Sequence, residues 1–309
     1  TFLGGFSAVC WTDFFQGMIM LAALLVAPLF ALALAKAGDG AVAGATLPEG
    51  FFNFFTTPQD FISGLGWGLG YFGMPHIIIR FMSLKSEKEL RKSSVIGISW
   101  TTIILIMSAL TAVAGRLYLG EIDDPSTVFI TMVRRIFPAL VSGLLLSAIL
   151  SAAMSTADSQ LLAASSAFAS DVYKPVIRKK ASDSEMLWAG RIVVIVIAVV
   201  ALMIASDPNS GSIMGLVENA WGVFGAAFGP VILLSLFWKR LTFGGTVAGI
   251  AAGAAVDILW LVFLSSTDIY EIVPGFAAGL LAAVVVSLLS KGPGKDVEDL
   301  FDRAVDLKS

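Results

Sequence analysis

Hydroxyl side chains gather in one otherwise apolar stretch of the sequence, SAAMSTADSQLL (151–162). Ser155 and Thr156 are adjacent, and Asp158 and Ser159 follow directly. Hydroxyl and carbonyl oxygens are hard, uncharged ligands that suit a small monovalent cation and suit a transition metal poorly. A carboxylate among apolar residues is costly and marks a candidate functional group. The stretch therefore predicts a cation site, against the alternative that its small residues only pack helices together.

Glycine recurs in a second apolar stretch, FISGLGWGLGYFGMPHIIIRF (61–81). Each glycine costs a helix about 1 kcal/mol relative to alanine, and an interior proline costs about 3. Within a membrane, an interrupted helix is tolerated where its freed backbone is buried or lines a cavity, and in transporters it marks the substrate site. If this segment is helical, Trp67, Tyr71 and Pro75 share a face and wall such a site. The alternative is that the aromatic residues form an interfacial belt.

The bulk composition places both stretches in a membrane protein. The chain has 309 residues, of which 57% are hydrophobic and 14% charged, and its mean hydropathy is +0.87. Apolar runs of about 20 residues recur, each long enough to cross a hydrocarbon core of about 30 Å. The lone Cys10 excludes a disulfide framework. Hydropathy predicts an all-α fold of about eight transmembrane helices, at residues 12–35, 60–82, 94–117, 138–164, 187–206, 213–237, 243–265 and 271–290.

The charged loops predict the orientation of these spans. Sixteen of the 20 lysines and arginines fall on one set of alternating connections: Arg80, Lys85, Lys88, Arg91, Lys92, Lys174, Arg178, Lys179, Lys180, Arg191, Lys239, Arg240, Lys291, Lys295, Arg303 and Lys308. Because basic loops stay in the cytoplasm, the short tail at 291–309 is expected there. The amino terminus has no initiating methionine and no signal peptide. We therefore expect one transmembrane domain over 1–309, incomplete at its amino terminus.

Three segments carry a resemblance to a known family. GWGLGYFGMPHIIIRFM (66–82), AAMSTADSQLLAASSAFASDVYK (152–174) and WGVFGAAFGPVILLSLFWKRLT (221–242) resemble the solute:sodium symporter family, in particular its proline-transporting members. The likeness runs along essentially the whole chain. It implies the leucine-transporter-type fold of two inverted five-helix repeats, of which this chain holds core helices 5–10 and two peripheral helices, without core helices 1–4.

The resemblance also implies roles for individual residues. The family's sodium site matches the carbonyl of Ala152 and the hydroxyls of Ser155 and Thr156, and its substrate site matches Trp67, Tyr71 and Pro75. Asp13 matches a carboxylate linked to cation passage, with helix capping as the alternative. Asp158 is not part of the expected family pattern, and it is either a second cation ligand or a pairing partner for another residue. Together with Asp13 and Ser159 it forms a candidate cation pathway. Met74 stands where glutamine is expected in proline-transporting members.

The implied function is sodium-coupled import of L-proline by alternating access, in the plasma (inner) membrane. The partners are sodium, a small-molecule substrate and the lipid bilayer, with no nucleic acid. Nothing in the sequence resembles a nucleophile–base set, so an enzyme is not expected. The alternatives are a sodium symporter for another solute (pantothenate, a sugar or a monocarboxylate) and a membrane solute sensor. His76 is expected to be structural, and no role is assigned to Glu218 or Asp257.

Overall fold

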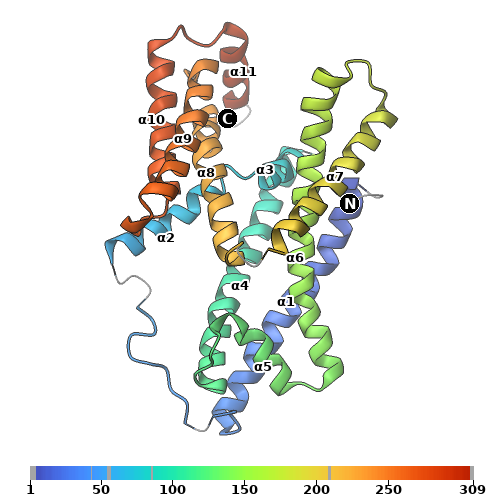
Figure 1. Ribbon diagram of the computed structural model, residues 1–309, viewed down its shortest axis with the longest axis vertical. Coiled ribbons are helices and arrows are strands. Elements are labelled where there is room, and N and C mark those ends of the chain that lie inside the picture. The colour runs from blue at the N-terminus through green and yellow to red at the C-terminus, as the bar shows by residue number, and fades with distance from the viewer. Residues whose placement is uncertain (1–4, 43, 54–56, 85, 208–209, 307–309) are drawn as a thin grey trace. The chain divides into compact units, whose positions relative to one another are not determined.

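The computed structural model describes residues 5–42, 44–53, 57–84, 86–207 and 210–306 (Figure 1). The first four residues, TFLG, and the last three of the tail lie outside these ranges. The described residues form helices and no strand. The chain forms two compact units, residues 1–52 with 83–201 and residues 53–82 with 202–309. The single transmembrane domain expected from the sequence stays a prediction.

The first unit is built from long helices. They are α1 (Gly5–Ala37), α4 (Glu87–Leu119), η1 (Pro125–Thr127), α5 (Val128–Ile136), α6 (Ala139–Ala167), the π-helical η2 (Phe168–Ile177) and most of α7 (Asp183–Ala205). The second unit holds the remaining elements. They are α2 (Pro58–Gly70), α3 (Pro75–Met82), α8 (Ile213–Phe237), α9 (Phe243–Phe263), η3 (Ser265–Thr267), α10 (Ile272–Leu289) and α11 (Lys295–Asp306).

Seven of these helices are long and apolar enough to cross a membrane. They correspond to seven of the eight predicted spans, with boundaries that differ by several residues. The eighth predicted span, at residues 60–82, is divided between α2 and α3. Hydropathy locates these segments because lipid cannot satisfy backbone polar groups, so each crossing must be an apolar helix.

Small residues let the helices of the first unit approach closely. Ala23, Ala27 and Ala31 of α1 are fully buried at four-residue spacing, so they lie on one face of the helix. They belong to a core that includes Met132 and Val133 of α5. α1 packs along both α4 and α6. This packing fixes the side of α6 that carries the serines.

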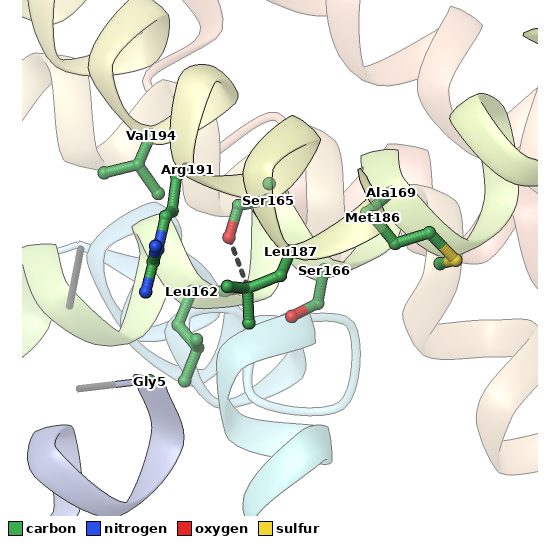
Figure 2. A pocket seen from close by; sticks show the side chains of 10 residues that line it. Gly5, Leu162, Ser165, Ser166, Ala169, Met186, Leu187, Arg191 and Val194 are labelled. Atoms are coloured by element: carbon green, nitrogen blue, oxygen red, sulfur yellow. Dashed lines mark hydrogen bonds between the residues drawn. The ribbon is translucent and has the colours of Figure 1, made fainter. Parts of the chain in front are cut away.

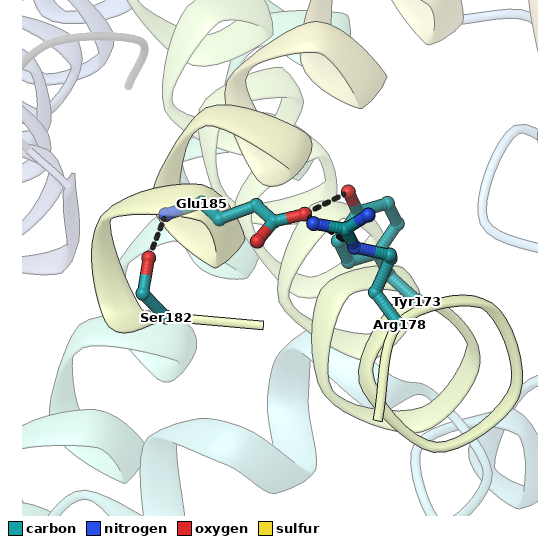
Figure 3. A network of polar contacts seen from close by, with 4 residues as sticks. All are labelled: Tyr173, Arg178, Ser182 and Glu185. Atoms are coloured by element: carbon teal, nitrogen blue, oxygen red, sulfur yellow. Dashed lines mark hydrogen bonds and ion pairs between the residues drawn. The ribbon is translucent and has the colours of Figure 1, made fainter. Parts of the chain in front are cut away.

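A polar network joins η2 to the start of α7 (Figure 3). The Tyr173 hydroxyl donates to Glu185 Oε1 at 2.8 Å, and Arg178 Nε lies 3.1 Å from the same oxygen. The backbone N–H of Glu185 donates to Ser182 Oγ at 3.2 Å. One carboxylate thus holds the end of η2 against the first turn of α7.

The second unit is packed through glycines. Gly245, Gly249 and Gly253 of α9 recur every four residues, as in membrane helices that pack backbone to backbone. A Cβ added at Gly253 would lie 2.1 Å from the carbonyl oxygen of Ala226 in α8. α8, α9 and α10 consequently form one close bundle, and α2 packs against α8 and α10 (Figure 1).

Candidate functional site

The glycine-rich segment is an interrupted helix, as the sequence predicts. α2 begins after Thr57, whose hydroxyl accepts from the Asp60 N–H at 3.1 Å while its own N–H donates to the Asp60 carboxylate at 2.9 Å. The helix ends at Gly70, and residues 71–74 form a turn. α3 then begins at Pro75, where a fixed φ and a missing N–H suit the first helical position.

The glycines do not act as the sequence predicts. Residues 64–70 stay helical, and the break comes only afterwards. A Cβ at Gly70 would lie 1.8 Å from Trp221 Nε1, and one at Gly73 would lie 2.3 Å from the Phe224 carbonyl oxygen. A Cβ at Gly66 would lie 2.7 Å from a methyl of Val273. The glycines therefore serve mainly to bring α2 and the turn against α8 and α10.

Four aromatic rings surround the end of α2, and we call them the aromatic cluster: Trp67, Tyr71, Trp221 and Tyr270. The Trp67 ring centroid lies 5.4 Å from that of Tyr270 and 6.1 Å from that of Trp221. Tyr71 meets Trp221 edge-on at 4.9 Å. The Trp221 indole N–H donates to the Trp67 carbonyl at 3.0 Å. Tyr71 keeps 55% of its surface exposed, so the cluster has an open side.

Two members of this cluster were not predicted. Trp221 begins the third segment that carries the family resemblance, and Tyr270 lies in the segment YEIVPGF (270–276). Their positions in the sequence give no sign that they lie near Trp67. The shared face expected for Trp67, Tyr71 and Pro75 is not formed, because the helix is broken between Tyr71 and Pro75. Pro75 is exposed at the start of α3, and Met74 beside it is buried.

Three oxygens meet on α6, in the first unit. The Ser155 hydroxyl donates to the Ala152 carbonyl oxygen at 3.1 Å, and the Thr156 hydroxyl donates to the same oxygen at 3.2 Å. Ser155 is half-buried and Thr156 is exposed. Because hydroxyl hydrogens rotate, both side chains can turn lone pairs toward a cation. The predicted oxygen set is therefore brought together on one side of the helix.

Ser159 connects this oxygen set to α1. Its buried hydroxyl lies 3.0 Å from the Ser155 carbonyl oxygen and 3.4 Å from Asp13 Oδ2, and it donates toward both. Asp13 is half-buried. The capping alternative for Asp13 is wrong, because α1 already begins at Gly5 and Asp13 lies beyond the second turn. Asp158 is half-buried on the same helix.

A small hollow lies in the first unit, between the end of α6 and α7 (Figure 2). Its volume is about 170 Å³, which is smaller than the roughly 300–1,000 Å³ of typical ligand pockets. Among the described residues that line it, Arg191 alone is charged. Leu162, Leu187 and Val194 give it apolar walls, and Ser165 Oγ donates to the Leu162 carbonyl. None of the predicted site residues lines this hollow.

The chain is similar to known proteins, and these relatives agree with one another in family. A family model described as the sodium:solute symporter family matches residues 1–253. The high-affinity proline transporter PutP of Bacillus subtilis is 44% identical over 316 residues, covering 100% of this chain and 67% of that protein. The sodium/proline symporter of Haemophilus influenzae is 44% identical over 325 residues, covering 98% of this chain and 64% of that protein.

Among solved structures, a Na⁺-coupled sialic acid symporter in a substrate-bound outward-open state has a TM-score of 0.72. It is 19% identical, with 95% of this chain and 64% of that chain covered. This likeness confirms the all-α leucine-transporter-type fold expected from the sequence. This chain spans about two thirds of the length of the relatives it matches. On the extent of the family match and these identities, the chain belongs to the sodium:solute symporter family.

Proposed function

We propose that the protein imports L-proline, or a small solute of similar shape, together with sodium by alternating access. The observation that carries this proposal is the interrupted helix at 71–74 with an aromatic cluster at its end. Relatives that match along nearly the whole chain are named proline transporters. Transport, and not catalysis, is the activity we propose.

The turn between α2 and α3 suits a zwitterion. The carboxyl end of α2 carries partial negative charge and the amino end of α3 carries partial positive charge. In transporters, such half-helix ends face charged groups of the solute. An amino acid brings one charge of each sign, and Trp67 and Tyr71 offer rings for its apolar part. We place Pro75 at the edge of this binding region.

Sodium is proposed to bind the oxygens of Ala152, Ser155 and Thr156. Their convergence within 3.2 Å of one carbonyl supports this assignment. The hydrogen bond from Ser159 toward Asp13 supports a cation pathway from α1 to this site, with Asp158 as a further oxygen donor. Sodium held here raises solute affinity by linkage if it favours the solute-binding conformation.

The driving force is sufficient for uptake across the plasma (inner) membrane. One positive charge moving through about 100 mV yields about 2.3 kcal/mol. A tenfold sodium gradient adds about 1.4 kcal/mol. Together they support accumulation of roughly several hundred-fold. The excess of basic residues on one set of loops favours a cytoplasmic carboxy terminus.

A second candidate is a sodium symporter for another solute, and Met74 favours it. Met74 is 6% exposed at the turn, where the resemblance leads one to expect glutamine. A thioether replaces an amide there, so a polar contact to proline would be lost.

The test is sodium-dependent uptake of radiolabelled proline. The full-length protein that contains this chain is reconstituted into liposomes. Uptake is then measured with either sodium or choline in the external buffer. Unlabelled proline, pantothenate, a sugar and a monocarboxylate serve as competitors. Sodium-dependent uptake that only proline inhibits supports the first proposal. Absence of sodium-dependent proline uptake, together with sodium-dependent uptake of one of the other compounds when that compound is labelled, supports the second. Uptake independent of sodium contradicts both.

A further inference from the structure

Two carboxylates are buried inside the second unit. Asp257, in the middle of α9, is 0% exposed, and Glu271, directly before α10, is 8% exposed. Both carboxylate oxygens of Asp257 and Oε1 of Glu271 are buried without a hydrogen-bond partner among the described residues. Such groups are rare, since buried polar atoms nearly always find a partner. Neither residue belongs to the aromatic cluster or to the oxygen set on α6.

The two acids converge on one glycine. Asp257 Oδ1 lies 3.1 Å from the position that a Cβ of Gly222 would take, and Glu271 Oε1 lies 3.3 Å from the same position. On another side, Asp257 Cβ lies 2.9 Å from the position of an added Cβ at Gly275. Both glycines therefore make room for the acidic side chains. The packing of α8, α9 and α10 brings the two carboxyl groups close together.

The helices that pack around the pair within the second unit carry no basic side chain. The sequences of α2, α8, α9 and α10, which pack together, contain no lysine, arginine or histidine. The ionisable side chains on these helices and at the residues that cap them are Asp60, Tyr71, Glu218, Asp257 and Glu271, and Tyr270 precedes Glu271. The nearest basic residues in the sequence, Lys239, Arg240 and Lys291, lie in the segments that follow α8 and α10. The Tyr270 hydroxyl is engaged, because it donates to the Glu218 carbonyl at 2.8 Å. Two neighbouring carboxylates in such a place do not both stay ionised, because burial and like charge each favour the neutral form.

A proton fits this place better than a metal ion does. The described residues contain no group of three or more His, Cys, Asp or Glu side chains placed to hold a metal. Gly222 and Gly275, which lie against the acids, add no side-chain oxygen. A metal cation such as Ca²⁺ takes six to eight oxygens, whereas a proton needs only one donor and one acceptor.

We propose that Asp257 and Glu271 form a proton-binding pair inside the second unit, with Asp257 as the protonated member at neutral pH. The pair adjoins the aromatic cluster, because Gly222 follows Trp221 and Glu271 follows Tyr270. Loss of the proton would place two like charges beside this part of the second unit.

Infrared spectroscopy tests the proposal directly. The complete translation product is reconstituted in lipid at neutral pH without sodium, and the C=O stretch of a protonated carboxylic acid is recorded. We expect the wild-type protein to show this band and Asp257→Asn, which keeps the size and the neutral shape, to lose it. Asp268→Asn is the matched control, since Asp268 is an exposed acid of the same unit. Its backbone has a left-handed conformation, which asparagine tolerates. This variant keeps the band.

The wild-type measurement does not depend on the folding of any variant. If Asp257→Asn fails to fold, Glu271→Gln replaces it, because removal of the neighbouring like charge must shift the alkaline loss of the wild-type band to lower pH. Absence of the band in the wild-type protein overturns the proposal. A band that neither substitution alters also overturns it. So does a band that sodium abolishes at constant pH, since the pair would then hold the metal cation. None of these outcomes depends on proline transport.

Discussion

The indole N–H of Trp221 donates to the carbonyl oxygen of Trp67 at 3.0 Å. Trp67 lies in the last turn of α2, where carbonyls have no partner within their own helix. A tryptophan of α8 thus satisfies the end of the interrupted helix. We expect Trp221→Phe to keep the ring and lose the bond, which lowers the free energy of unfolding by about 1–2 kcal/mol. It should also weaken solute binding, as measured by uptake at varied solute concentration.

Trp188→Phe is the control for this substitution. Trp188 lies on α7, is 52% exposed, and its ring is covered by Arg191 at 4.9 Å. It should leave solute affinity unchanged. Equal solute affinity in Trp221→Phe and the wild-type protein would show that the bond does not organise the binding region.

We expect alanine substitutions at two glycines of α2 to have opposite effects on stability. A Cβ at Gly70 would lie 1.8 Å from Trp221 Nε1, whereas a Cβ at Gly68 would meet nothing within 4 Å. Gly70→Ala should therefore destabilise the protein by about 1–3 kcal/mol through overpacking. Gly68→Ala should be neutral, or stabilising by up to about 1 kcal/mol, because alanine favours the helix. Thermal unfolding in detergent measures both. A similar loss from both substitutions would mean that helix flexibility, and not close packing, explains the glycines.

The sequence predicts the spans and the interrupted helix because both follow from local chemistry. An apolar run of sufficient length must form a helix in lipid, and the Gly–Met–Pro segment at 73–75 cannot continue one. The oxygen set on α6 is equally local, since Ala152, Ser155 and Thr156 lie within one helical turn. These features need no knowledge of distant residues.

The partners that complete the sites are distant in sequence. Trp221 reaches Trp67 across 154 positions, and Ser159 reaches Asp13 across 146. Asp257 reads as an isolated interruption of an apolar helix, and only the packing of α8 against α9 and α10 shows that Glu271 meets it at Gly222. The capping alternative for Asp13 depended on where α1 begins, and a helix boundary is the feature that local patterns fix least well.

A salt bridge holds α11 to the loop before α9. Lys239 Nζ lies 2.5 Å from Asp302 Oδ2, and this hydrogen bond raises the pKa of Lys239 above its ordinary value of 10.5. Because the folded pKa is the higher one, the stabilisation is fully present below the ordinary value and is lost as pH rises through the folded one. α11 should therefore stay docked at neutral pH. Lys239→Met should speed amide hydrogen exchange in α11, whereas Lys291→Met, at an exposed lysine, should not.

Ser159 joins the proposed cation pathway to the oxygen set. Ser159→Ala removes the hydrogen bond toward Asp13, and loss of one such bond of about 1 kcal/mol should raise the half-saturating sodium concentration about fivefold. Ser165→Ala is the control, because Ser165 is also buried on α6 and, among the described residues, its hydroxyl donates to a carbonyl of its own helix, that of Leu162. Sodium titration of uptake distinguishes the two. Equal shifts would assign the effect to the stability of α6.

The oxygen set on α6 makes the most direct prediction. Replacement of both Ser155 and Thr156 by alanine removes two hydroxyls and leaves the Ala152 carbonyl in place. If each neutral ligand contributes about 1 kcal/mol, the half-saturating sodium concentration should rise about thirtyfold. Ser147→Ala is the matched control, since Ser147 Oγ bonds a carbonyl of its own helix, that of Leu144, at 2.6 Å. Sodium dependence that is unchanged in the double variant, with uptake intact, would remove these hydroxyls from the site. A shift seen equally in Ser147→Ala would instead show that any loss of a helix-bound hydroxyl suffices.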